Sequence, residues 1–163
     1  MAAVDYFLKL EDGFDGESHD SKHKNEIDLE SWSWGETNTG TGHSGGGHGA
    51  GKVVMQDLHC VIKYQKVSPK LMLACATGQH ITKGTLLCRR AGTEQQEYLK
   101  IVMTDILVSS YQTGGSSHGD VVPTDQFSLN FAKIEFDYKP QKQDGTLDSS
   151  VKAGYNIKEN KKV

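Results

Sequence analysis

Ser31-Trp32-Ser33-Trp34-Gly35 is followed by a long connection, Glu36 to Gly51, and then by Lys52-Val53-Val54-Met55-Gln56-Asp57-Leu58. The first segment has the aromatic composition of a β-strand, and the last has strand periodicity. The connection is rich in Gly, Thr, Ser and His and has no hydrophobic period, which excludes a helix or a strand ladder. Compact domains keep structureless connections of this length for binding or assembly. The sequence therefore predicts an extended loop over about residues 36–51 that either cradles a phosphate or docks on another copy of the chain.

Two glycine patterns in this loop match nucleotide-binding motifs. Gly40 to Gly45 spells G-x-G-x-x-G, and Gly46 to Lys52 spells G-x-x-x-x-G-K. Both motifs hold phosphate at the beginning of a helix, whose amides and dipole face the anion. The residues after Lys52 have strand periodicity instead, and Val53 stands where a Walker loop carries Ser or Thr. We therefore expect no nucleotide and no other cofactor.

The composition indicates one domain over residues 1–163. The net charge of −3 gives no basic footprint for nucleic acid. The apolar runs are far shorter than the ~18 residues that span a membrane, and the N-terminus lacks the pattern of a signal peptide. We expect synthesis in the cytoplasm, no membrane or nucleic-acid partner, and export, if any, by a machine that needs no cleaved signal.

Several residue types that often bind metals are present without a convincing site. His19 and His23 are four residues apart and could share a metal on a helix, but residues 14–26 have no apolar face and are predicted to be a solvated loop. The cysteines are odd in number and widely spaced, which is typical of small buried hydrophobic residues. These are Cys60, Cys75 and Cys88. No metal site is predicted.

A second glycine loop, residues 113–120, contains Ser116, His118 and Asp120. A catalytic triad needs these residue types to converge in space around a buried acid. Neighbours in a glycine loop cannot be relied on to do so. We therefore predict no catalytic residue and no enzymatic activity.

Alternating apolar residues predict many short strands. The segments are Val4–Leu10, Lys52–Tyr64, Thr85–Arg90, Tyr98–Tyr111, Phe127–Tyr138 and a last one at Gly154–Ile157. The longest, Tyr98–Tyr111, is apolar on both faces, which indicates that both are covered at least in part.

The apolar residues change from one face of the strand to the other near Glu30-Ser31 and again near Ala132-Lys133. We call this an inversion of the apolar phase, and a β-bulge at each place would explain it. After the first inversion Ser33 faces away from the tryptophans, onto a polar surface.

One helix is predicted, over about residues 68–77. Ser68 is a candidate N-cap, Pro69 suits the first helical position, and Gly78 suits the left-handed residue beyond the end. The helix is short and apolar, so it should pack against a sheet. Together the segments predict a mainly β fold, either a compact β-barrel or two packed sheets, with one short α-helix and a long extended loop.

The chain also resembles a known family. The matching segments follow the family's order: Val4-Asp5-Tyr6-Phe7-Leu8-Lys9, Gly16-Glu17-Ser18, Glu26-Ile27-Asp28, Ser31-Trp32-Ser33-Trp34-Gly35, Gly51-Lys52-Val53, Gln56-Asp57-Leu58, Leu71-Met72-Leu73-Ala74-Cys75, Glu97-Tyr98-Leu99, Val108-Ser109-Ser110, Leu129-Asn130-Phe131-Ala132, Tyr138-Lys139-Pro140-Gln141 and Gly154-Tyr155-Asn156. On these residues the chain resembles Hcp, the haemolysin-coregulated tube protein of bacterial type VI secretion systems.

The resemblance implies a ring-forming structural protein. Family members assemble as hexameric rings that stack into a hollow tube inside a contractile sheath, capped by a spike protein of the valine-glycine repeat family. The tube is secreted and can carry effector proteins in its lumen. The expected partners are therefore further copies of the chain, the spike protein, the sheath and the effectors. A small monomeric β-barrel binding module or adaptor is the alternative.

The resemblance also assigns roles to particular residues. It implies that the loop reaching an adjacent ring comprises Thr39, Gly40, Thr41, Gly42, His43, Ser44, Gly45, Gly46, Gly47, His48, Gly49, Ala50 and Gly51. It implies that Ser33 and Ser116 face the lumen and its effectors. Because His43, His48 and His118 would add like charge when protonated, we expect acidification below about pH 6.5 to weaken ring stacking.

Overall fold

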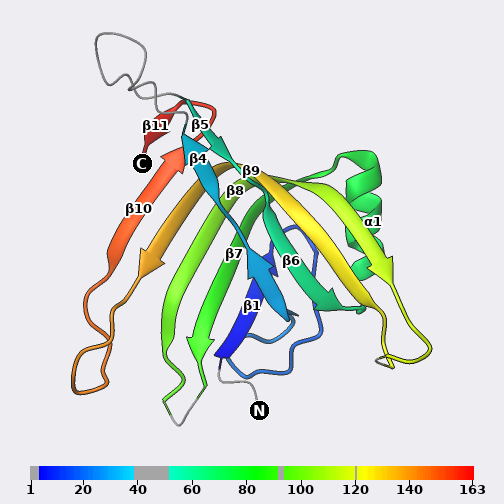
Figure 1. Ribbon diagram of the computed structural model, residues 1–163, viewed down its shortest axis with the longest axis horizontal. Helices are drawn as coiled ribbons and strands as arrows, with labels where there is room; N and C mark the ends of the chain where they lie inside the picture. Colours follow the sequence, from blue (N-terminus) through cyan, green and yellow to red (C-terminus); the bar gives the residue numbers. More distant parts are fainter. Residues whose placement is uncertain (1–3, 39–51, 92–93, 120) are drawn as a thin grey trace.

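The computed structural model describes residues 4–38, 52–91, 94–119 and 121–163 (Figure 1). These ranges form eleven β-strands and one α-helix. In chain order they are β1 (Val4–Leu10), β2 (Ile27–Asp28), β3 (Ser31–Ser33), β4 (Glu36–Asn38), β5 (Val53–Met55), β6 (Leu58–Lys63), α1 (Ser68–Thr77), β7 (His80–Arg90), β8 (Glu97–Gly114), β9 (Thr124–Tyr138), β10 (Val151–Asn156) and β11 (Lys161–Lys162).

Nine strands form one antiparallel sheet, whose main order is β11-β10-β9-β8-β7-β1-β2. The long strands β8 and β9 pair along most of their length and lie at its centre (Figure 1). On its other edge β9 has two successive neighbours: β6 beside its first half and β10 beside its second half. The two surfaces considered below are built on these two halves of β9.

The segment Ile27–Ser33 closes the sheet into a barrel. Its first residues, β2, pair with β1, and its last, β3, pair with β6. Between them the Leu29 amide donates to the Tyr6 carbonyl at 2.9 Å, and the Glu30 amide donates to the Val61 carbonyl at 2.8 Å. The chain thus passes from one edge of the sheet to the other. The predicted bulge here is wrong: the apolar phase inverts because the strand changes its pairing partner.

The second predicted bulge, near Ala132, is also wrong in its cause. The β8–β9 register does not shift there, since Thr104 pairs with Lys133 and the pairs on either side keep the same offset. Instead, Asp105, which lies opposite Ala132, adopts a left-handed φ of 57°. In β8 and in β9 the inward-facing positions shift by one residue at the same place, so the pairing of the two strands is preserved. A register shift does occur elsewhere, between Val108 and Ser110.

The paired change of phase brings apolar residues of β8 to one core. The sequence divided them between two faces, but the structure buries four on the inside: Ile101, Met103, Ile106 and Val108. Leu107 and Val102, expected on the two faces, are only half-buried. The fully buried apolar residues of β8 therefore belong to one core on one side of the strand.

The helix α1 lies beside the sheet (Figure 1) and packs on β8. Val67, Leu71 and Ala74 enter the core. Gly78 ends the helix at φ 72° and donates its amide to the Ala74 carbonyl, as predicted. Ser68 is not the N-cap: its buried hydroxyl accepts from the Gln65 amide at 3.0 Å, ahead of the helix. No helix among the described residues is long and apolar enough to cross a membrane.

The predicted loop of residues 36–51 begins later than expected. Glu36–Asn38 form β4, which pairs with β5 as a separate two-stranded ribbon. Val53–Met55 form a strand and no helix, so the element that a phosphate loop requires does not follow Lys52. The proposed ring-stacking residues, Thr39 to Gly51, lie outside the described residues.

Residues 14–26 are not the solvated loop that their polarity predicted. Phe14 is buried in the core, and Ser18 and His23 are buried as well. The segment returns on itself, because the Gly16 amide donates to the Asn25 carbonyl at 2.8 Å. It covers Phe7, a β1 residue whose side chain lies outside the barrel core.

Candidate functional site: a polar sheet face and an apolar groove

A polar face covers the outside of the sheet where β3, β6, β9 and β8 lie side by side. Directly paired residues of antiparallel strands point to the same side of a sheet. The pairing therefore aligns two rows on this outer side. One row is Ser33, His59, Ser128 and Ser110, and the other is Ser31, Val61, Gln126 and Gln112. All eight residues are exposed or half-buried. The intervening row, from Trp32 through Cys60 and Phe127 to Tyr111, points inward.

The irregularity between Val108 and Ser110 shapes this polar face. It turns two consecutive serines toward the same neighbour, because the hydroxyls of both Ser109 and Ser110 hydrogen-bond the Ser128 hydroxyl. Ser109 also donates to the Asp57 carboxylate, whose other oxygen accepts from the Asn130 amide at 2.9 Å. The result is a compact polar cluster at the surface whose members satisfy one another.

The structure places the two residues expected to face the lumen on different elements. Ser33 is exposed on the polar face, opposite to Trp32, as its phase predicted. Ser116 lies in the loop after β8, where its hydroxyl accepts from the His118 amide at 3.3 Å. His118 is exposed there, whereas Asp120 and the two loop histidines lie outside the described residues. None of the described contacts joins Ser116 to the row that contains Ser33.

Sequence reasoning missed the other members of the polar face. Asp57, Ser109 and Ser128 come from three different strand regions, and only the register of those strands brings them together. The pair Ser109-Ser110 was a usable signal, because two small polar residues interrupt an otherwise apolar strand. The sequence could not say which strand they would face.

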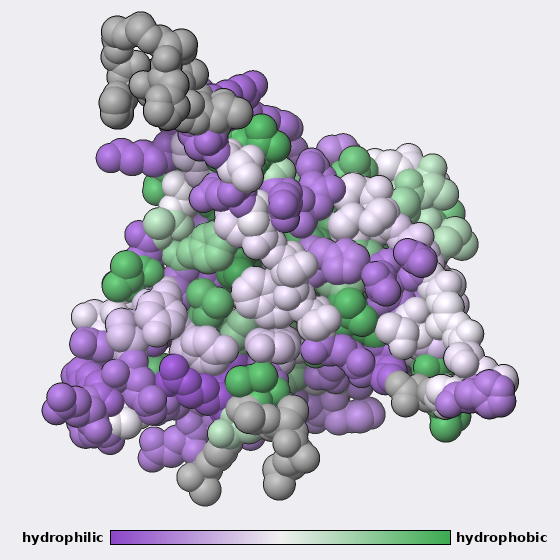
Figure 2. All heavy atoms as spheres, viewed as in Figure 1, coloured by the Kyte–Doolittle hydropathy of each residue, from purple (hydrophilic) through white to green (hydrophobic). Residues whose placement is uncertain are grey.

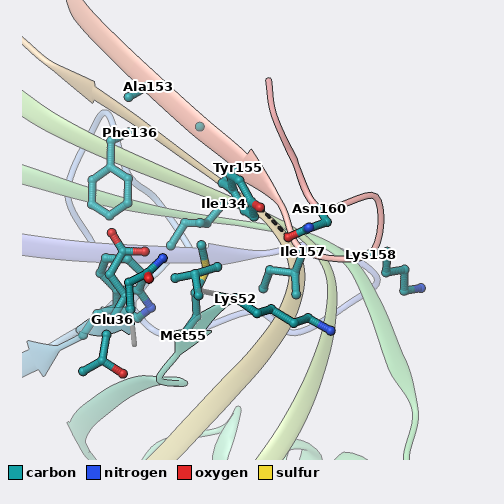
Figure 3. Close-up of a pocket in the computed structure, with 15 residues that line it drawn as sticks. Glu36, Lys52, Met55, Ile134, Phe136, Ala153, Tyr155, Ile157, Lys158 and Asn160 are labelled. Carbon is teal, nitrogen blue, oxygen red and sulfur yellow. Dashed lines mark hydrogen bonds between the residues drawn. The ribbon is translucent and has the colours of Figure 1, made fainter. Parts of the chain in front are cut away.

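An apolar groove lies on the inner side of the sheet, between the β4–β5 ribbon and β10 (Figure 3). Its volume is about 940 Å³. Its apolar lining comes from the ribbon, the second half of β9 and the C-terminal segment: Trp34, Val53, Met55, Ile134, Phe136, Ala153 and Ile157. Glu36, Lys52 and Lys158 add charge at its border. In the space-filling view, hydrophobic residues are visible in this region between β4 and β10 (Figure 2).

Trp34 lines the groove and has a buried donor without an acceptor in the described part of the chain. Its ring packs on Phe136 with centroids 5.4 Å apart. Its indole Nε1–H is shielded from water but has no acceptor among the described residues. Buried donors are nearly always paired in finished structures. A partner that fills the groove would cover its apolar lining.

The two buried cysteines, Cys60 and Cys88, do not provide a nucleophile. Burial raises the pKa of the Cys60 thiol far above its ordinary value and that of Cys88 to about 11, so both thiols stay protonated and unreactive. Cys75, expected to be buried like the other two, is half-buried. No group of three or more His, Cys, Asp or Glu within the described ranges is arranged to hold a metal ion.

These features define a class of protein. Its described residues form a closed antiparallel barrel with one flanking helix, and its distinctive features are two surfaces, the polar face and the apolar groove. The chain belongs to the Hcp family of type VI secretion, because residues 7–138 match the family model described as "Type VI secretion system effector, Hcp".

Individual relatives agree with this assignment over almost the whole chain. Protein hcp1 of Pseudomonas aeruginosa is 51% identical over 160 residues, which cover 97% of this chain and 98% of that protein. The crystal structure of Hcp1 from Salmonella typhimurium is similar with a TM-score of 0.79 and 34% identity, over 99% of this chain and 100% of that one. A structure described as a type six secretion system protein has a TM-score of 0.92 and 31% identity, with the same coverage.

Proposed function

We propose that this chain is the structural subunit of a type VI secretion tube, and that it assembles as hexameric rings that stack. The observation that carries the proposal is the family match over residues 7–138. A 51% identical relative, matched over nearly the whole length of both chains, supports it. The subunit acts by assembly and carries out no chemical reaction.

The groove supports ring formation by a head-to-tail contact. A closed ring needs two different surfaces on each subunit, so that every copy offers one and receives the other. The groove between the β4–β5 ribbon and β10 provides an apolar surface. Burying such a lining against a second copy would supply hydrophobic free energy. In this arrangement the neighbouring copy occupies the groove.

The polar face supports a water-filled lumen. Its exposed and half-buried side chains, such as Ser33, Gln126 and Gln112, are mostly small or uncharged and make no contiguous apolar patch. A surface of this kind tolerates hydration when it lines a channel. Ser33 on this face and Ser116 in the loop beyond β8 would contact the effectors that the tube carries.

The wider assembly follows from the same assignment. The loop from Thr39 to Gly51 would contact the adjacent ring, the spike protein with valine-glycine repeats would cap the tube, and the contractile sheath would surround it. The chain would be made in the cytoplasm and secreted through the system without a cleaved signal. Protonation of His43, His48 and His118 would weaken stacking by adding like charge.

The mass of the purified protein in solution tests the proposal. Analytical ultracentrifugation near neutral pH and in modest salt should give a species of six subunits of 17.9 kDa each. Negative-stain images of the same sample should show rings of uniform diameter. A protein that remains a monomer at high concentration would contradict the proposal and favour a monomeric barrel adaptor.

A further inference from the structure

Two consecutive serines of β8 share one neighbour on the polar face. The β8–β9 register shifts between Val108 and Ser110, so Ser109 is the extra residue of a β-bulge. Both serines are exposed, and both hydroxyls reach the hydroxyl of Ser128 on β9. Bulges re-aim side chains in this way and are over-represented beside functional sites. The bulge therefore directs attention to what these three hydroxyls present to a partner.

A carboxylate at one end decides the direction of the hydrogen bonds in this cluster. The Ser109 hydroxyl donates to a carboxylate oxygen of Asp57. A serine hydroxyl has one proton, so Ser109 can only accept in its 2.8 Å contact with Ser128, which must donate. The Ser128 proton is then also in use, and the third hydroxyl, that of Ser110, must donate to Ser128. All three protons point along one chain, from Ser110 through Ser128 and Ser109 to Asp57.

This order leaves acceptors, and no hydroxyl proton, for a partner. The Ser110 oxygen begins the chain and accepts nothing within it, so its lone pairs are open to solvent. Asp57 accepts from Ser109 at one carboxylate oxygen and from the Asn130 amide at the other, at 2.9 Å, and each oxygen has a further lone pair. The NH₂ group of Asn130 faces the carboxylate, which turns its carbonyl oxygen away from it. The outward groups are therefore mainly acceptors.

The cluster also carries a charge that no bonded cation compensates. Both groups that Asp57 bonds among the described residues, Ser109 and Asn130, are neutral. The eight residues of the two rows on this face include no lysine and no arginine. Hydrogen bonds in a chain polarise one another, so the carboxylate at its end strengthens Ser110 as an acceptor. A positively charged group that has only donors matches such a site.

We propose that Asp57 orders the three hydroxyls into an acceptor site, and that this site binds an arginine or lysine side chain of the effectors. The inference rests on the proposed function, in which the polar face lines the lumen and contacts the effectors. Arginine fits better than lysine, because its planar guanidinium donates to several acceptors at once. The contact is weak, because both partners are hydrated before they meet. A weak contact suits cargo that is carried and then released.

Two blocked tripeptides that differ only in charge test the chemistry of the site. One has arginine between two glycines, and the other has citrulline, whose neutral urea has nearly the shape of the guanidinium. Each is titrated onto the isotope-labelled, deuterated full chain and followed by amide nuclear magnetic resonance. The arginine peptide should shift the Ser109, Ser110 and Asn130 amides saturably, and at low salt should bind about threefold or more tighter than the citrulline peptide. About 0.5 M salt should largely remove this preference.

Two variants separate the ordered chain from charge alone. Asp57→Asn removes the charge and the acceptor that sets the direction of the chain, so both peptides should bind equally. Ser128→Ala keeps the charge but disconnects Ser110 from Asp57, so the preference for arginine should fall to an intermediate value. If Asp57→Asn does not fold, Ser128→Ala still decides whether the hydroxyl chain contributes.

The matched control is Asp144→Asn. It removes a carboxylate that also bonds a hydroxyl, that of Thr146, but in the turn between β9 and β10. The net charge of the chain changes by the same amount as in Asp57→Asn. The control should keep the full preference for the arginine peptide.

Several results would overturn the proposal. Equal affinity of the natural sequence for both peptides would do so, as would shifts confined to other surfaces. A preference that survives in Asp57→Asn, or that is lost in Asp144→Asn, would show that the charge acts elsewhere. A full preference in Ser128→Ala would refute the ordered chain.

These readouts are separate from the test of the proposed function, because the site is complete within one chain. Rings without a preference for arginine would contradict the acceptor site alone. A monomer that prefers the arginine peptide would contradict the tube subunit and support the acceptor chemistry of the site.

Discussion

The two halves of β9 carry surfaces of opposite character. The first half contributes Ser128 to the polar face, where hydroxyls, an amide and a carboxylate bond one another. The second half contributes Ile134 and Phe136 to a groove that leaves apolar surface uncovered. The difference teaches where association energy can come from. A surface whose polar groups already bond one another gains little from a partner, whereas an exposed apolar surface gains hydrophobic free energy when a partner covers it.

The largest expected effect is on assembly, from a charge placed in the groove. Ala153 lines the groove and pairs with Phe136, so Ala153→Asp would bury an unpaired carboxylate in any copy-to-copy contact. We expect the six-subunit species to be replaced by monomers in analytical ultracentrifugation. Lys152→Gln is the control, because its side chain points to the other side of the same strand and the change removes only an exposed ion pair with Asp137. Hexamers of Ala153→Asp would show that the ring uses a different edge.

The next effect is on folding stability beneath the groove. Ile134 is 2% exposed and belongs to the core. Ile134→Ala should lower the free energy of unfolding by about 2–5 kcal/mol, since it removes buried methyl groups and leaves a cavity. Urea denaturation measures the change under conditions where the protein is a monomer, for example in the Ala153→Asp background. A loss below about 1 kcal/mol would mean that the groove lining relaxes around the cavity.

The polar face should be less sensitive. Ser128→Ala removes the hydroxyl that both Ser109 and Ser110 bond, but those serines can bond water instead. We expect a loss of about 0.5–1.5 kcal/mol in the same denaturation experiment. An effect as large as that of Ile134→Ala would erase the contrast between the two surfaces and show that the cluster acts as a structural centre.

The smallest effect on the fold is expected at Ser33. This exposed residue makes no core contact, so Ser33→Gln should change the free energy of unfolding by less than about 0.5 kcal/mol. Ring formation should be retained. If the polar face lines the lumen, the added bulk should reduce the amount of effector that co-purifies with the rings. Ser150→Gln, at an exposed serine between β9 and β10, is the control and should have no effect.

The sequence predicted the local features of this protein well. The alternation around Trp32 placed Ser33 on the exposed side, and Pro69 and Gly78 bounded the helix closely. Both inversions of phase were located correctly, but their causes were not. A change of pairing partner and a bulge leave the same trace in a one-dimensional pattern, because each turns the following side chains over.

The missed residues share a physical reason. Polar composition predicted a solvated segment around His23, yet a polar ring can be buried when both of its nitrogens have partners, here carboxylates of Glu26 and Glu97. The pairing partner Glu97 is 74 residues away in the chain. The Asp57 cluster likewise depends on contacts across 52 and 73 residues. No local pattern carries such information.

By itself, then, the sequence determined most of the longer strands, the helix and its end, and the family, because these depend on short-range alternation, on glycine and proline geometry, and on motifs in order. The tertiary structure alone decided which strands are neighbours. That choice closes the barrel through Ile27–Ser33, gathers the serines around Asp57, leaves the groove beside Trp34 open and seats His23 between two carboxylates. The reason is that register and closure are set by packing across the whole sheet, where residues distant in the chain meet.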